Sequence, residues 1–171
     1  AMQAWKEGRF AEAHEHFELA HRLYPRDGGM LTEFANFLMA TGQFEAALPL
    51  VETAHLTHGW IVRTTVTLIH AYLANGLYDE AIATGWTALR TGGNPATAFP
   101  VRAHAQQQSG RLDDAVASWR LSIRYTPDAP WQHHGHLARA RAAAGYPDAA
   151  LAGLDSARTA VSDSSALAVL G

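Results

Sequence analysis

Histidine is the residue type of this 171-residue sequence that first suggests chemistry, because ten are present and several stand close together. His133, His134 and His136 form one group, and His14 and His16 form another. Two residues three positions apart, such as His133 and His136, share a helix face and could ligate a metal. The chain has no cysteine, and no carboxylate stands at a matching spacing, so the ligand set is incomplete. We therefore predict no metal site and no cofactor, and we interpret these histidines as solvated or partly paired side chains.

A second set of polar side chains recurs at regular intervals. Its members are Asn36, His70, His104 and Arg139, with Gln107 and Gln108 close behind the third of them. Amide, imidazole and guanidinium groups can hydrogen-bond a peptide backbone, and a guanidinium also pairs with a carboxylate. We interpret the six residues as a binding surface for an extended peptide, which its histidines would make sensitive to pH near about 6.5. The alternative is a solvated face without a partner, since polar residues are mostly exposed.

Several other kinds of function find no support in the sequence. It contains no glycine-rich phosphate loop, no GxSxG nucleophile motif and no HExxH motif, so we predict that the protein is not an enzyme. The formal net charge is −3 and the basic residues are scattered, which argues against a nucleic-acid partner. No apolar run approaches the about 20 residues that span a bilayer. We expect a cytoplasmic protein, and a periplasmic location is also compatible with the sequence.

The polar residues follow a repeat that runs through the whole chain. Equivalent segments start at glycines 8, 42, 76, 110 and 145, which are 34, 34, 34 and 35 residues apart (42−8, 76−42, 110−76, 145−110). Small residues recur where helices would approach closely, and every copy has alanine five positions after the glycine: Ala13, Ala47, Ala81, Ala115 and Ala150. Bulky residues mostly stand four positions later, as at Phe17, Val51 and Trp119. A fixed period of this length indicates a repeat architecture.

This combination of period, small positions and aromatic positions resembles the tetratricopeptide repeat (TPR) family. The resemblance implies an all-α fold: a right-handed superhelical solenoid of about five helix–turn–helix repeats, of which the first is truncated. The whole chain, 1–171, would be a single solenoid. Its repeats would span approximately 1–27, 28–61, 62–95, 96–129 and 130–162, followed by a tail at 163–171. In this family the first helix of each pair, the inner helix, lines the concave groove, and the second is the outer helix, so the recurring polar residues would lie in the groove.

The local sequence predicts where the helices begin, end and pack. The expected helices span 10–23, 29–41, 44–57, 60–75, 78–91, 96–109, 112–125, 130–144 and 147–161. Phe10, Ala13, Phe17, Ala20 and Leu23 are spaced as the core face of the helix over 10–23. Asp27 and Asp128 are suited to open helices, and Pro95 fits a first turn. Pro49 should kink its helix, and Pro100 should bend or delay its own.

One helix position lacks the bulk that the repeat usually carries. Gly85 stands nine residues after Gly76, where other copies have Phe17, Val51 or Trp119. Close packing in protein interiors leaves few voids. We therefore expect Trp86 or a neighbouring repeat to fill the space beside Gly85.

The resemblance predicts a non-catalytic scaffold whose partner is a protein or peptide. Some family members hold a carboxylate terminus with a clamp of Lys, Asn and Arg, but the corresponding residues here are Thr32, Asn36, Thr67, Thr97 and Val101. Because both clamp cations are missing, this mode of binding is not expected. Two alternatives remain open. The chain could be a regulatory or docking module of a larger enzyme or assembly, or a self-associating structural module that forms homo-oligomers through its open ends.

Overall fold

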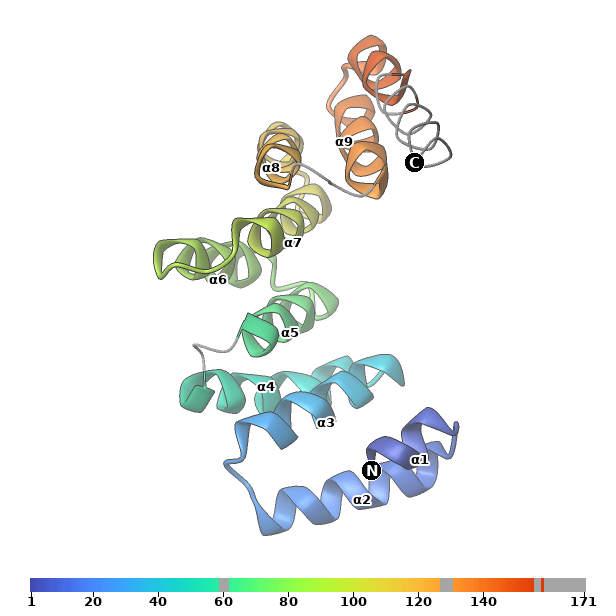
Figure 1. The fold of residues 1–171 in the computed structure, drawn as a ribbon, viewed down its shortest axis with the longest axis vertical. Coiled ribbons are helices and arrows are strands. Elements are labelled where there is room, and N and C mark those ends of the chain that lie inside the picture. Colours follow the sequence, from blue (N-terminus) through green and yellow to red (C-terminus); the bar gives the residue numbers. More distant parts are fainter. Residues whose placement is uncertain (59–61, 127–130, 156–157, 159–171) are drawn as a thin grey trace, which may run out of the picture. The chain divides into compact units, whose positions relative to one another are not determined.

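The computed structural model describes residues 1–58, 62–126, 131–155 and 158, and these residues form helices and turns without any strand. The all-α prediction is confirmed. Figure 1 shows the helices in chain order, and a further helical segment spans 147–155. Their bounds are α1 Met2–Lys6, α2 Phe10–Leu23, α3 Gly28–Ala40, α4 Phe44–His58, α5 Val62–Ala74, α6 Tyr78–Arg90, α7 Pro95–Gln108, α8 Leu112–Tyr125 and α9 Trp131–Ala143. Each expected helix is present within one or two residues of its predicted ends wherever the ends are described.

The chain divides into two compact units, residues 1–84 and 85–171, and the boundary lies within α6. Each unit is described by itself below as unit 1 and unit 2. The single continuous solenoid over 1–171, with its repeat boundaries, stays a prediction. Within the described helices, none is long and apolar enough to cross a membrane.

The recurring glycines have one backbone conformation in common. The φ angles of Gly8, Gly42, Gly76, Gly110 and Gly145 lie between +73° and +89°. A residue with a side chain pays about 1–2 kcal/mol to adopt this left-handed region, which glycine enters freely. Each of these glycines lies in the turn between two helices. The period of the sequence therefore corresponds to the same turn occurring five times.

The core of unit 1 is formed by α1 to α5 and is rich in contacts between aromatic rings. Phe17 on α2 stacks on Phe34 of α3 with ring centroids 5.2 Å apart. The ring centroid of Phe37 lies 5.3 Å from that of Phe17. Figure 1 shows α1 beside α2 and α3 beside α4, in agreement with their contacts. The predicted core face of α2 is wrong at its ends, where Phe10 is 53% and Leu23 is 62% exposed. These are the first and last residues of α2, and they extend past the packed part of the helix.

The repeated alanines are the most consistently buried positions of the fold. Ala13, Ala47, Ala81 and Ala115 have no exposed surface, and Ala150 is 5% exposed. A larger side chain at such a position would meet a neighbouring helix, because helix axes pack only about 8–10 Å apart. Alanine therefore recurs for reasons of packing.

Several helix starts and interior prolines behave as local chemistry dictates. The Asp27 side chain caps α3 by accepting a hydrogen bond from the backbone N–H of Met30 at 2.8 Å. Pro95 lies in the first turn of α7, as expected, and the side chain of Asn94 caps the helix. Pro100 does not delay α7, because the helix begins at Pro95 and continues through it. Likewise α4 continues through Pro49. The predicted cap at position 128 lies outside the described residues.

In unit 2, a buried arginine fills the space beside Gly85. Arg102 on α7 is only 6% exposed, and a Cβ atom at Gly85 would lie 2.8 Å from its Cγ. Its guanidinium lies 3.7 Å from the ring centroid of Trp86. Of the two alternatives expected for Gly85, the neighbouring repeat is confirmed, since the stem of Arg102 occupies the gap, whereas Trp86 instead covers the charged end of this arginine.

Candidate functional site

In unit 1 the recurring polar residues are only partly available to a ligand. Asn36 on α3 is half-buried, and its Oδ1 accepts a hydrogen bond from Thr67 Oγ1 at 3.2 Å. His70 on α5 is exposed, and within the described part of the chain it has no hydrogen bond. Desolvation by nearby protein atoms nevertheless lowers the pKa of His70 below its usual 6.5. The neutral His70 imidazole can therefore both donate and accept at neutral pH.

In unit 2 the recurring polar residues lie close together, because an additional histidine connects them. The ring of His104 on α7 meets the ring of His136 on α9 edge to face, with centroids 4.6 Å apart. His136 Nδ1 accepts a hydrogen bond from Arg139 Nη2 at 2.5 Å, one turn further along α9. The nitrogen that accepts this bond carries no proton, so the His136 ring proton is on Nε2. His104, His136 and Arg139 thus form one connected polar surface.

Two glutamines extend this surface along α7. Gln108 is exposed, whereas Gln107 is half-buried and its Oε1 has no hydrogen-bond partner in the described part of the chain. A buried acceptor without a partner is costly, and rotation of the Gln107 side chain toward a ligand N–H would relieve this cost. We call the five residues His104, Gln107, Gln108, His136 and Arg139 the inner-helix patch. It combines donors and acceptors that a peptide backbone could use.

A buried tryptophan supports the inner-helix patch from below. Trp119 on α8 is 1% exposed, and the ring of His136 stacks on it at 4.7 Å with an interplanar angle of 6°. His104 meets the same indole edge to face at 4.9 Å, and His133 lies 5.7 Å from it. His133 is held in turn by a 3.1 Å hydrogen bond between its Nδ1 and Ser122 Oγ. The indole therefore fixes the positions of three imidazoles.

The sequence alone did not reveal this cluster, although it contained the signals. Trp119 occupies the bulky position of the fourth repeat, and His133 and His136 are three residues apart on the next helix. What pairs the indole with these imidazoles is the register of α8 against α9. A helix pattern predicts which face is buried, but it does not predict which residues of two helices are level with each other.

His133 and His136 have lower pKa values than an ordinary histidine. Burial lowers the pKa of His136 below 6.5, and the charges of Arg139 and His133 lower it further. Burial and the neighbouring His134 lower the pKa of His133. Both rings are therefore neutral in the folded protein at pH 7, while the unfolded chain takes up protons below about 6.5.

We expect the stability of unit 2 to fall as the pH decreases from about 6.5 through the lowered pKa values, and to be insensitive to these rings above about 7. Urea midpoints measured between pH 8 and 5.5 would test this. The double variant His133→Asn/His136→Asn should reduce the pH dependence. An equally steep decline in the variant would assign the pH dependence to other groups.

Within the described part of the chain, few side chains are available to bind a metal ion or to clamp a carboxylate. No three His, Asp or Glu side chains converge there as a metal site would require. The Nδ1 atoms of His133 and His136 are engaged by Ser122 and Arg139. At the clamp positions, Thr32 is 1% exposed and shares a 3.1 Å hydrogen bond with Thr64.

Comparison with known proteins identifies the repeats. Models of the tetratricopeptide repeat match residues 4–58 and residues 101–120. No protein of curated function matches the chain significantly. Among solved structures, a crystal structure of MamA aligns with a TM-score of 0.80 at 15% identity, covering 95% of each chain. MamA from Desulfovibrio magneticus RS-1 aligns at 0.79 and 13% identity, covering 92% of this chain and 89% of that chain.

A third similar structure is itself a TPR protein. It comes from Thermus thermophilus and aligns with a TM-score of 0.70 at 23% identity, covering 91% of this chain and 85% of its own. Sequence identities this low show a shared fold only. Repeat models, glycine turns, buried alanines and shared architecture agree with one another. The chain is a member of the tetratricopeptide repeat family.

Proposed function

We propose that the protein is a non-catalytic scaffold that binds an extended segment of a protein partner on the exposed side of its inner helices, with the inner-helix patch as the main contact in unit 2. The TPR fold generally serves protein–protein interaction and generally carries no catalytic site. The single observation that carries the proposal is the connection from His104 through His136 to Arg139. It gathers side chains from two successive inner helices, α7 and α9, on one partly exposed surface.

The chemistry of this patch suits a peptide backbone. Gln108 and Arg139 are exposed, so their donors can reach a ligand without rearrangement. The half-buried Gln107 has an acceptor that lacks a partner within the described residues and that would reach a ligand once the side chain rotates outward. Because Trp119 and Ser122 hold the imidazoles in place, little conformational entropy is lost at the patch when a ligand binds. Asn36 and His70 would contribute to an equivalent surface in unit 1.

We expect the double variant Gln108→Ala/Arg139→Ala to bind its partner about tenfold or more weakly, because it removes an amide and a guanidinium from the patch. Both side chains are exposed, so the urea midpoint should change little. Partners captured from lysate with the purified chain would be identified by mass spectrometry, and their affinities for wild type and variant would then be measured.

The matched control is His16→Ala/Arg22→Ala, which changes two exposed residues on the outer helix α2. It should capture the same partner with unchanged affinity. If the patch variant binds as tightly as wild type, the inner-helix patch is not the binding surface. If the control weakens binding as much as the patch variant does, the partner binds elsewhere or through general electrostatics.

A further inference from the structure

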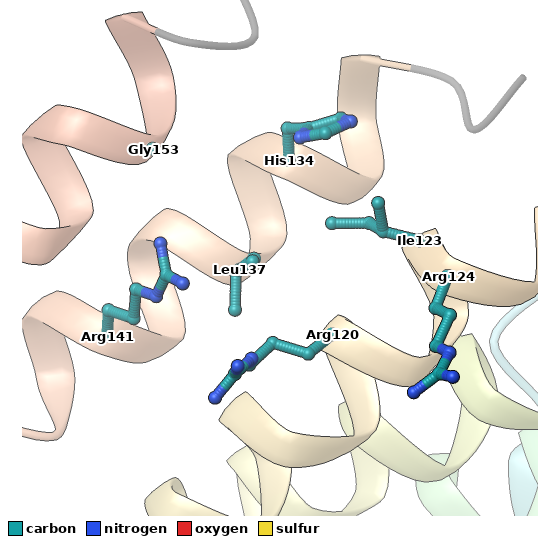
Figure 2. Close-up of a pocket in the computed structure, with 7 residues that line it drawn as sticks. All are labelled: Arg120, Ile123, Arg124, His134, Leu137, Arg141 and Gly153. Atoms are coloured by element: carbon teal, nitrogen blue, oxygen red, sulfur yellow. The ribbon is translucent and has the colours of Figure 1, made fainter. Parts of the chain in front are cut away.

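A separate pocket lies on the other side of α9, between α8, α9 and the helical segment 147–155. Its volume is about 370 Å³, within the range of small-ligand sites. Figure 2 shows the side chains that line it, with Leu137 between Arg120 and Arg141. The lining residues on α8 are Arg120, Ile123 and Arg124, and those on α9 are His134, Leu137 and Arg141. We call this the arginine pocket.

The ionisable side chains that line the arginine pocket are all basic. Three guanidinium groups and one imidazole line it, and none of its lining residues is a carboxylate. The residues three and four positions from Arg120 are Val116, Ala117, Ile123 and Arg124, so no acid on α8 lies one turn away to neutralise it. Within the described part of the chain, Arg120 and Arg124 form no ion pair. Two like charges one turn apart repel each other, and a bound anion would relieve this repulsion.

The third arginine is held in place by the backbone. Arg141 Nη1 donates a 3.0 Å hydrogen bond to the carbonyl of Ala149. Gly153 makes room for the same guanidinium, because a Cβ atom there would lie only 2.7 Å from Nη1. Arg141 is thus anchored at one nitrogen, and its remaining donors stay available. An anchored guanidinium loses little freedom when it binds a carboxylate in bidentate fashion.

The floor of the arginine pocket is apolar. Leu137 is 7% exposed and Ile123 is half-buried, and both lie among the guanidinium groups. A ligand that used the whole pocket would present carboxylates to the arginines and an aliphatic or aromatic group to Leu137. An acidic peptide segment with an apolar residue has this combination, whereas a free phosphate has only the charge.

From these observations we infer that the arginine pocket binds an acidic segment of a protein partner, with Asp or Glu carboxylates on Arg120, Arg124 and Arg141 and an apolar side chain on Leu137. The inference rests on the proposed function as a protein-binding scaffold and adds a second surface to it. On α9, the residues of the pocket are offset from those of the inner-helix patch. At 100° per residue, Arg141 lies about 200° around the helix from Arg139, so one partner segment does not cover both.

The test is a selection from a random peptide display library on the full chain, with affinities of the selected peptides measured by fluorescence anisotropy. We expect enriched peptides to combine Asp or Glu with apolar residues and to bind about tenfold or more weakly to Arg120→Ala/Arg124→Ala. Both arginines are exposed, and circular dichroism would verify that the variant is folded. Binding should also weaken as salt is raised.

The control Arg22→Ala/Arg26→Ala removes two exposed arginines with the same spacing from unit 1, so it matches the change in net charge. It should bind the selected peptides as wild type does. The inference is wrong if the selected peptides are not acidic, if both double variants weaken binding equally, or if only inorganic phosphate binds in a manner that depends on Arg120 and Arg124. Because the patch variant Gln108→Ala/Arg139→Ala is measured beside them, failure here is distinguishable from failure of the inner-helix patch.

Discussion

Replacing Trp119 with alanine is expected to lower the free energy of unfolding of unit 2 by about 3–5 kcal/mol, the usual cost of removing a buried aromatic side chain. Trp119 is 1% exposed and belongs to the core formed with Ala103, Ala115 and Leu137. Its loss would leave a cavity and would also remove the surface on which His104 and His136 rest. Ligand binding at the inner-helix patch should therefore weaken together with stability.

Urea unfolding followed by circular dichroism would measure this effect, with Trp131→Ala as the control. Trp131 is 67% exposed and its removal should change the free energy of unfolding by about 0.5 kcal/mol or less. Trp119→Phe should cost less than Trp119→Ala, because phenylalanine keeps most of the ring and the indole N–H has no acceptor within the described residues. Equal effects at Trp119 and Trp131 would contradict the packing described for α8 and α9.

Replacing Ala47 with leucine is expected to lower the free energy of unfolding of unit 1 by about 1–3 kcal/mol, because overpacking forces neighbouring side chains or helices to shift. Ala47 has no exposed surface and lies in the core with Phe37, Leu38 and Val51. Three added carbon atoms find no space at this position. The intrinsic helix propensity of leucine is close to that of alanine, so the loss would report packing and not local helix stability.

The neighbouring residue provides the control for this experiment. Ala46 precedes Ala47 on α4 and is exposed, so Ala46→Leu changes the same residue type on the same helix without touching the core. Its free energy of unfolding should stay within about 0.5 kcal/mol of wild type. If Ala47→Leu were no more destabilising than Ala46→Leu, the alanine at this position of each repeat would not mark the helix contact.

The two proposed surfaces explain why α9 has no simple hydrophobic face. His136 and Arg139 belong to the inner-helix patch, while His134, Leu137 and Arg141 line the arginine pocket. Only Leu137, Ala138 and Ala140 are buried on this helix. A helix that packs on both sides and exposes polar groups between its contacts shows weak amphipathic periodicity. The role proposed for α9 therefore follows from the side chains of the helices beside it and not from the hydrophobic pattern of its own sequence.

The repeat, the helices and their turns could all be predicted from local sequence. Glycine at positions 8, 42, 76, 110 and 145 is required by a left-handed turn, and alanine five residues later is required by close helix approach. Both requirements act over a few residues, so a single sequence records them directly. The space beside Gly85 was predictable for the same reason, since a missing side chain must be replaced by a neighbouring one.

Which polar residues meet could not be predicted in this way, because it depends on how the helices pack. Packing joins His104 to Arg139 through His136, engages the oxygen of Asn36 with Thr67, and brings Arg141 to the same pocket as Arg120. These contacts depend on how far one helix is shifted and rotated against the next. Many registers bury nearly the same apolar area, because the hydrophobic effect is non-directional and roughly proportional to area. The hydrophobic pattern therefore builds the scaffold, and the specific packing of neighbouring side chains sets the register that makes a site.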